Sequence, residues 1–197
     1  MTNPTDQKIL RKMLRKQRLT LTKPQKKQLG FLATRQFSHL QHRFLNKKSA
    51  KVGVFIDAFG ELPTQFLVNY LFLKGFEVYL PVVTHEKKPL SFVKITQQNS
   101  YKNRLMRHTF GMRQPTKGKK IQAKQLDIII MPLVALDKKG NRLGMGGGFY
   151  DKSLANCKNK PVKIGWAYDF QLVEKLNVNV WDIGLDMAVL PSGLMIF

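Results

Sequence analysis

The 197-residue chain is 43% hydrophobic, and single cores typically form at about 100 to 200 residues, so it can bury a substantial core. This composition excludes an intrinsically disordered chain, and no run of about 18 apolar residues is present to predict a membrane-spanning helix. The formal charge of +22 attracts polyanions, and the basic residues are spread along the whole chain. The charge alone therefore does not distinguish an enzyme from an RNA-binding protein. We expect one domain over residues 1–197 and, because the start lacks an apolar signal core, a cytoplasmic protein.

The first quarter of the chain is predicted to be helical. Residues 5–48 contain only one glycine and read as two helices, with a break and cap at residues 22–24. The basic residues of the first helix are typical of a solvated helix face, and anion contact is the alternative for any one of them. The sparse apolar stripe among them consists of Ile9, Leu10, Met13 and Leu14.

A β-α-β unit is predicted to follow. Residues 51–59 are short, branched and aromatic, as a buried strand should be. Residues 61–75 repeat apolar side chains at helical spacing, and residues 76–83 predict a second strand. The two strands should be parallel, and ligands of such sheets bind at the carboxyl ends of the strands. The loop that contains Glu61 is therefore placed where chemistry can occur.

The remaining elements complete an α/β fold. Residues 97–125 are polar, basic and broken by glycine and proline, which predicts an excursion rather than a core element. Residues 126–136 form a continuous apolar run and predict a central strand. Residues 162–170 predict another strand, and residues 185–197 a terminal strand or hairpin. We expect a mixed, largely parallel sheet flanked by helices, with the N-terminal helices packed on one side.

Residues 141–151 have the composition of a phosphate-binding loop. They read N-R-L-G-M-G-G-G-F-Y-D, directly after the apolar run and before a helix predicted to begin near Phe149. Glycines let backbone N–H groups approach a ligand, and the following helix N-terminus favours phosphate. Arg142 supplies an anion contact and Asp151 a hard oxygen ligand for magnesium. No Lys-Ser or Lys-Thr follows the glycines, so this is not a P-loop, and a glycine-rich turn without a ligand is the alternative for such a motif alone.

The pattern R-L-G-x-G-x-G-[YF]-Y-D, after an apolar strand and a P-x-x-A-x-D segment, resembles the signature of the 5-formyltetrahydrofolate cyclo-ligase family. Residues 131–137, MPLVALD, match the preceding segment. The resemblance spans nearly the whole chain rather than the glycine loop alone. Four further stretches match the family in order, namely the helix with Leu10-Arg11 and residues 52–64, 110–115 and 162–171.

The resemblance implies an ATP- and magnesium-dependent enzyme that converts 5-formyltetrahydrofolate to 5,10-methenyltetrahydrofolate and releases ADP and phosphate. In the family, ATP phosphorylates the formyl oxygen, the second folate nitrogen attacks the activated carbon, and phosphate leaves. Such chemistry needs positioning and charge neutralisation rather than a covalent nucleophile, so no catalytic residue is assigned. We expect a monomer that binds ATP and 5-formyltetrahydrofolate, with or without a polyglutamate tail, and no membrane. No specific nucleic acid is expected, although the charge would support weak non-specific binding.

The resemblance also assigns site residues by motif. Magnesium binding is assigned to Asp151 and Asp182. For Asp182, the alternative is an aspartate in a solvated turn. Folate binding is assigned to Glu61, Phe110 and Tyr150. The carboxylate of Glu61 can accept hydrogen bonds from the paired N–H donors of a pterin edge. For Glu61 the alternative is a helix N-terminal glutamate stabilised by the helix dipole. The ATP contacts are Lys8, Arg11, Arg142, Gly144, Gly146, Gly147, Gly148, Phe149 and Tyr150.

Two rival functions and several departures from the family pattern stay open. A basic RNA- or ribosome-associated protein is the rival from another class, although no RNP-type strand or KH-type loop supports it. Another ATP-dependent ligase or kinase could use the same glycine loop. The lone Cys157 excludes an intrachain disulfide. The departures are Gln7, Gln114, Trp181 and Leu190-Pro191, where lysine, glutamate, histidine and Thr-Glu are common in the family.

Overall fold

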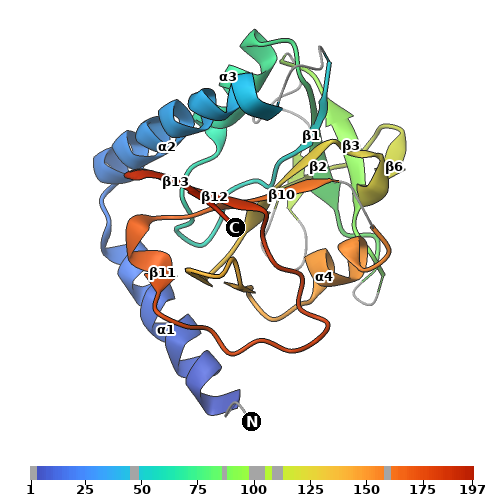
Figure 1. The fold of residues 1–197 in the computed structure, drawn as a ribbon. Helices are drawn as coiled ribbons and strands as arrows, with labels where there is room; N and C mark the ends of the chain where they lie inside the picture. Colours follow the sequence, from blue (N-terminus) through green and yellow to red (C-terminus); the bar gives the residue numbers. More distant parts are fainter. Residues whose placement is uncertain (1–3, 45–48, 86–87, 98–104, 108–112, 158–160) are drawn as a thin grey trace.

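The computed structural model describes residues 4–44, 49–85, 88–97, 105–107, 113–157 and 161–197 (Figure 1). An eight-stranded sheet with the order β13-β12-β10-β7-β1-β2-β3-β6 forms its centre. Its strands are β1 (Lys51–Gly53), β2 (Glu77–Val82), β3 (Ser91–Ile95), β6 (Lys120–Gln122), β7 (Ile128–Pro132), β10 (Val162–Trp166), β12 (Met187–Leu190) and β13 (Gly193–Ile196).

Smaller elements surround this sheet. A three-stranded sheet has the order β11-β8-β9, and β4 pairs with β5. These strands are β4 (Leu105–Arg107), β5 (Arg113–Pro115), β8 (Ala135–Asp137), β9 (Arg142–Leu143) and β11 (Leu172–Val173). The helices are α1 (Pro4–Thr20), α2 (Lys23–Phe44), α3 (Gln65–Leu73) and α4 (Phe149–Leu154), with short 3-10 turns η2 (Ala123–Gln125) and η3 (Asp169–Gln171). Within the described ranges, no helix has both the length and the apolar character needed to cross a bilayer.

The sheet is mixed and largely parallel, which confirms the predicted α/β class. Strands β1, β2, β7, β10 and β12 run parallel, as the pairing of Val52 with Val78 and of Ile130 with Ile164 illustrates. Strands β3 and β13 run antiparallel to these strands, and β6, at one edge, pairs antiparallel with β3. The predicted terminal hairpin is formed by β12 and β13.

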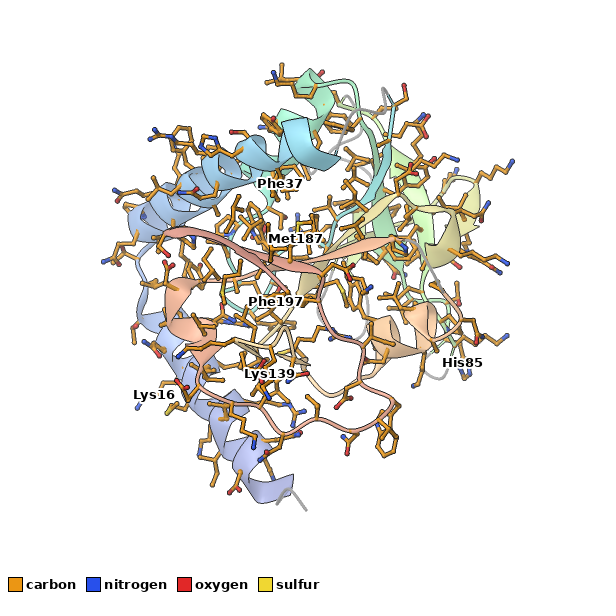
Figure 2. The ribbon with its side chains drawn as sticks, viewed as in Figure 1. Lys16, Phe37, His85, Lys139, Met187 and Phe197 are labelled. Atoms are coloured by element: carbon orange, nitrogen blue, oxygen red, sulfur yellow. The ribbon has the colours of Figure 1, made fainter. Side chains whose placement is uncertain are left out.

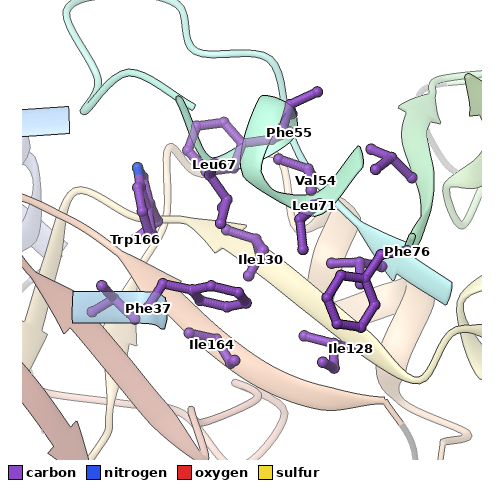
Figure 3. Packing of buried hydrophobic residues seen from close by; sticks show 14 of the residues in the cluster. Phe37, Val54, Phe55, Leu67, Leu71, Phe76, Ile128, Ile130, Ile164 and Trp166 are labelled. Carbon is purple, nitrogen blue, oxygen red and sulfur yellow. The ribbon is translucent and has the colours of Figure 1, made fainter. Parts of the chain in front are cut away.

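The central strand β7 is buried on both faces, as expected for a strand in the middle of a parallel sheet. Ile128 and Ile130 face the layer of α2 and α3, where they belong to one buried cluster with Phe37 and Leu71 (Figure 3). Ile129 and Met131, which alternate with them, face a second cluster that includes Leu154 of α4. Alternating side chains of one strand therefore join the helices of both layers to the sheet.

The two N-terminal helices meet at a capped break. The Thr22 N–H donates to Gln25 Oε1 at 2.8 Å and the Gln25 N–H donates to Thr22 Oγ1 at 3.4 Å, which is a capping box. Helix α2 packs on the main sheet, whereas α1 packs on the smaller sheet through Leu14, beside Val134 and Leu143. This places α1 next to the loop that follows β9.

The predicted apolar stripe of α1 is only half right. Leu10 and Leu14 face inward, but Ile9 and Met13 are 60% and 55% exposed. The buried residue one turn after Leu14 is Arg18, which is 1% exposed. Adjacent positions on a helix lie about 100° apart, so 9 and 13 point away from the face that 14 and 18 share.

Three strand predictions differ from the structure. The first strand ends at Gly53, because Asp57 and Thr64 hold the following segment as a loop. The apolar run 126–136 divides into β7 and β8 after Pro132, whose ring nitrogen cannot donate to a ladder. The stretch predicted as an excursion contributes β6 to the edge of the main sheet.

Positive charge is distributed around the molecule. In Figure 2 the labelled Lys16, on α1, and Lys139 lie on different parts of the molecule. This agrees with the spread of basic residues along the sequence.

Candidate active site

A pocket of about 1070 Å³ opens where the parallel strands β1, β2 and β7 end. The residues after β1, including Phe55 and Glu61, form one wall, and Val83 and Pro132 mark the ends of β2 and β7. The opposite wall consists of residues 142–152, which are the glycine loop and the start of α4. Pockets for small molecules typically measure about 300 to 1,000 Å³, so this one is large enough for an extended ligand.

The glycine loop has a backbone that other residues adopt at a cost. Gly146 has φ +102° and Gly148 has φ +63°, both in the left-handed region. Gly147 has no room for a side chain, because a Cβ there would lie 2.9 Å from the Phe149 ring. The N–H groups of Gly146, Gly147 and Gly148 donate no hydrogen bond within the described part of the chain, which leaves them available to an anion.

Arg142 and Asp151, which the sequence predicts as separate ligand contacts, are paired with each other. Arg142 Nη2 lies 2.5 Å from Asp151 Oδ1, and the two side chains are 4% and 22% exposed. Asp151 Oδ1 also accepts the Ile183 N–H at 3.0 Å. The buried Nε of Arg142 has no hydrogen-bond partner among the described residues. The pair therefore braces the loop from its two ends.

Asp182 lies beside this pair. The hydrogen bond from Ile183, the next residue, to Asp151 holds the two aspartates close together, and both line the pocket. Asp182 Oδ2 accepts the Asn179 N–H at 2.7 Å, so Asp182 is also the turn aspartate of the alternative interpretation. The described residues contain no group of three or more metal-ligating side chains. Two carboxylates nevertheless fit Mg²⁺, which usually takes one or two protein carboxylates and fills its other positions with phosphate oxygens and water.

Helix α1 reaches the glycine loop through Arg11. Arg11 Nε donates to Gly144 O at 2.9 Å, and its Nη2 donates to Gln7 Oε1 at 3.3 Å. Gln7 Nε2 in turn donates to Asn177 O at 2.8 Å. Arg11 and Gln7 line the pocket, whereas Lys8 is exposed on α1 and is absent from the lining that the described residues form.

Glu61 lies in the loop after β1 with its side chain 10% exposed. Its Oε2 accepts the Ala58 N–H at 2.9 Å, and its Oε1 is 4.0 Å from Arg18 Nη1. Burial raises the pKa of Glu61 to about 7, against the opposing effects of the Ala58 hydrogen bond and the Arg18 charge. Both protonation states are thus populated near neutral pH. Because α3 begins only at Gln65, Glu61 is not in the first turn of that helix.

The aromatic residues of the motif lie beside the loop. Tyr150 lines the pocket, and burial, followed by the charge of Glu61, raises the pKa of its hydroxyl. The hydroxyl therefore stays protonated and can donate a hydrogen bond. Phe149 also lines the pocket, with Lys152 Nζ 6.0 Å from its ring centroid. Phe110 lies outside the described residues.

Sequence reasoning missed several residues at the site. Phe59 and Met145 line the pocket and are 42% and 43% exposed. Trp181 and Gln114, noted only as departures from the family pattern, also line it. Trp181 is 68% exposed, and a large exposed aromatic at a pocket is a sign of ligand contact that its sequence position alone did not give. Gln114 Oε1 accepts the Val83 N–H at 2.9 Å.

Known proteins are similar to this chain over most of its length. The 5-formyltetrahydrofolate cyclo-ligase family matches residues 3–191. The 5-formyltetrahydrofolate cyclo-ligase of Escherichia coli (strain K12) is 38% identical over 185 residues, which cover 91% of this chain and 97% of that protein. The Haemophilus influenzae protein of the same name is 34% identical, with 93% of this chain and 96% of that protein covered. Among solved structures, the 5,10-methenyltetrahydrofolate synthetase of Aquifex aeolicus superposes with a TM-score of 0.78 at 30% identity, over 96% of this chain and 92% of that one.

Proposed function

Because this chain belongs to the 5-formyltetrahydrofolate cyclo-ligase family, we propose that it converts 5-formyltetrahydrofolate to 5,10-methenyltetrahydrofolate with ATP as co-substrate. One observation carries the proposal. A single pocket joins a glycine loop with unpaired N–H groups to two arginines and two aspartates at one wall, and to a buried glutamate at the other. The wall with the glycine loop, arginines and aspartates suits a nucleoside triphosphate, and the buried glutamate suits the N–H-rich edge of a pterin.

In this proposal the glycine loop and the arginines hold ATP. The N–H groups of Gly146, Gly147 and Gly148, together with Gly144, surround the phosphates. Arg11 and Arg142 neutralise their charge, and each guanidinium has further N–H donors besides the Arg11 Nε on Gly144 O and the Arg142 Nη2 on Asp151. Lys8 approaches from the exposed surface of α1 as an outer contact. Phe149 and Tyr150 border the nucleotide at the start of α4.

Asp151 and Asp182 would hold Mg²⁺. When bound, the ion would reduce the repulsion between the negative charges of the phosphates. Asp151 Oδ1 is already engaged by Arg142 and Ile183, so its other oxygen is the one suited to a metal. Likewise, Asp182 Oδ2 accepts the Asn179 N–H within its own turn, so Oδ1 is the oxygen of Asp182 suited to the metal.

Glu61 and Tyr150 would hold the folate. A carboxylate accepts two parallel N–H groups from the pterin edge, and Glu61 has one oxygen without a hydrogen bond in the described residues. Tyr150 would donate from its protonated hydroxyl. Phe110 stays a proposed member of this half of the site.

The proposed reaction has two steps. The formyl oxygen attacks the γ-phosphorus of ATP, and the bond to ADP breaks. The second folate nitrogen then attacks the formyl carbon and loses its proton, and the phosphate leaves with the former formyl oxygen and takes up that proton. The side chains orient the two ligands, offset charge and exclude water, which is how proteins accelerate phosphoryl transfer without a covalent intermediate.

The test is the near-ultraviolet absorbance of methenyltetrahydrofolate in a mixture of the purified protein, 5-formyltetrahydrofolate, MgCl₂ and ATP. An absorbance rise that requires ATP, and that Asp151→Ala abolishes, supports the proposal. No rise with a folded protein would contradict it and would favour a related ATP-dependent ligase or kinase. Omission of MgCl₂ with a chelator present tests the metal separately.

The proposal includes a monomeric, single-domain enzyme over residues 1–197 with a cytoplasmic location. One sheet that runs through the described ranges supports the single domain. The distributed charge supports weak, salt-sensitive binding of nucleic acid at most. A sequence-selective RNA complex that resists moderate salt would contradict this and would favour the RNA-binding alternative.

A further inference from the structure

Arg18 is fully buried and poorly satisfied. Its Nη2 donates to Leu133 O, while Nε and Nη1 have no hydrogen-bond partner among the described residues. Burial lowers the pKa of Arg18, although an arginine keeps its charge in proteins. A buried guanidinium with unpaired N–H groups is costly, so packing alone does not explain an arginine at this position.

Arg18 Nη1 faces Glu61 from behind the wall of the pocket. The distance to Glu61 Oε1 is 4.0 Å, and Glu61 lines the pocket while Arg18 is not among the described lining residues. The loop rests directly on the helix here, because a Cβ on Gly60 would lie 3.2 Å from Arg18 Cβ. Leu133 O, the anchor of Arg18, also accepts from the buried Gln171 at 2.9 Å. The side chain of Arg18 is thus anchored at Leu133 O, and the loop that carries Glu61 is held against α1.

Other charged and titratable groups also face Glu61. Asp57, in the same loop, opposes its ionisation, whereas Arg15 favours it from an exposed position on α1. Tyr168, beyond β10, donates to the backbone oxygen of Glu61 at 3.1 Å, and Tyr150 faces Glu61 from α4. Of the two cations that favour the carboxylate, Arg18 is the buried one and has the larger effect.

We propose that Arg18 is a positioning residue for the ligand contact of Glu61, supplying its counter-charge from behind the pocket wall and leaving Oε1 free to accept from the pterin. The inference rests on the proposed function. A separation of 4.0 Å attracts the carboxylate without occupying it by a hydrogen bond. The unpaired Nη1 of Arg18 is thereby explained, because a direct hydrogen bond would withdraw Oε1 from the ligand.

The test is a double-mutant cycle on folate affinity. Binding of 5-formyltetrahydrofolate is measured by calorimetry without ATP, from about pH 6 to about pH 9, in the wild type, Arg18→Gln, Arg18→Lys, Glu61→Gln and the double variant. We expect Arg18→Gln to weaken binding at pH 7 by about fivefold, because a rise of one unit from a pKa of about 7 lowers the ionised fraction of Glu61 from about one half to about one tenth, and to recover affinity at higher pH. Arg18→Lys should retain most of the affinity. Arg18→Gln should add little once Glu61 is Gln.

The outcomes separate a positioning role from a structural one. Equal weakening with and without Glu61, or an unchanged pH profile in Arg18→Gln, would overturn the inference. Arg15→Gln is the matched control on the same helix and should change the affinity little, because Arg15 is exposed. If Arg18→Gln does not fold, Arg18→Met, which removes the charge without leaving a buried polar group, takes its place in the cycle. A wild type that binds no 5-formyltetrahydrofolate would overturn the proposed function itself.

Discussion

The guanidinium of Arg142 and the carboxylate of Asp151 form an ion pair 2.5 Å long across the nine-residue span of the glycine loop. The pair joins the residue before the loop to the first turn of α4. It therefore couples the shape of the loop to two side chains that are also proposed to bind ligand.

Asp151→Asn should impair both stability and turnover. The variant removes the counter-charge of an arginine side chain that is 4% exposed, so we expect a loss of about 2 kcal/mol in the free energy of unfolding, less than for a fully buried pair because Asp151 is 22% exposed. Turnover should fall at least about 100-fold, as for loss of one preorganised charge contact. Denaturant unfolding and the absorbance assay measure the two effects. Asp182→Asn is the control, since Asp182 has no arginine partner among the described residues and its loss should reduce turnover with little loss of stability.

The backbone of the glycine loop predicts a second result. Gly146 and Gly75 both have positive φ, +102° and +77°, and a Cβ at either position would meet nothing within 4 Å. Alanine at each site should therefore cost about 1 kcal/mol from backbone strain alone. Only Gly146→Ala should also weaken ATP binding, because Gly75 ends α3 away from the pocket. Equal ATP affinities for the two variants, by calorimetry, would contradict a phosphate role for the loop.

The pKa of Glu61 predicts the pH dependence of stability. A folded-state pKa of about 7, against 4.5 for the ordinary group, means that between these values the folded protein holds a proton that the unfolded chain has lost. The wild type should therefore lose stability as the pH rises from about 4.5 to about 7, by up to about 3 kcal/mol, and no more above that range. Relative to the wild type, Glu61→Gln should gain stability over the same interval. Unfolding curves of both proteins at several pH values test this, and parallel pH profiles would contradict it.

Arg11 and Lys8, both predicted from the sequence as ATP contacts, should differ in their effects. Arg11 lines the pocket and binds Gly144 O, whereas Lys8 is exposed. We expect Arg11→Gln to weaken ATP binding by about tenfold or more, since it removes a charged contact and a brace of the loop. Lys8→Gln should have an effect of about threefold or less, because solvent and salt screen its charge. A larger effect of Lys8→Gln would mean that α1 moves toward the nucleotide.

Local patterns predicted the elements of the fold well, but they did not predict which polar side chains meet. The β-α-β unit, the capped helix break and the terminal hairpin all follow from periodicity and from glycine or proline positions. In the run L-R-K-M-L-R-K-Q-R-L, the burial of Arg18 depends on Glu61 and Leu133, which are distant in the sequence. Its four-residue spacing from Leu14 was the available local signal.

In the candidate site, too, local motifs indicated which residues belong together but not how their side chains pair. Residues with a motif, such as Gly146 and Asp151, could be placed near one another from the sequence. The pairing of Arg142 with Asp151 could not, because either residue alone suits a free ligand contact. The position of Trp181 on the pocket depends on the bond between Ile183 and Asp151, which only the folded chain forms.

Trp181 should report ligand binding directly. The chain has two tryptophans, and Trp166 is 2% exposed with its Nε1 donating to Pro63 O, whereas Trp181 is 68% exposed on the pocket. Addition of MgCl₂ and a non-hydrolysable ATP analogue should shift the tryptophan emission to shorter wavelength and reduce quenching by acrylamide, because the ligand removes water from the exposed indole. Trp181→Phe should abolish both changes and leave the emission of Trp166. If the analogue binds by calorimetry but the wild-type emission is unchanged, Trp181 stays in solvent and the nucleotide occupies only the inner part of the pocket.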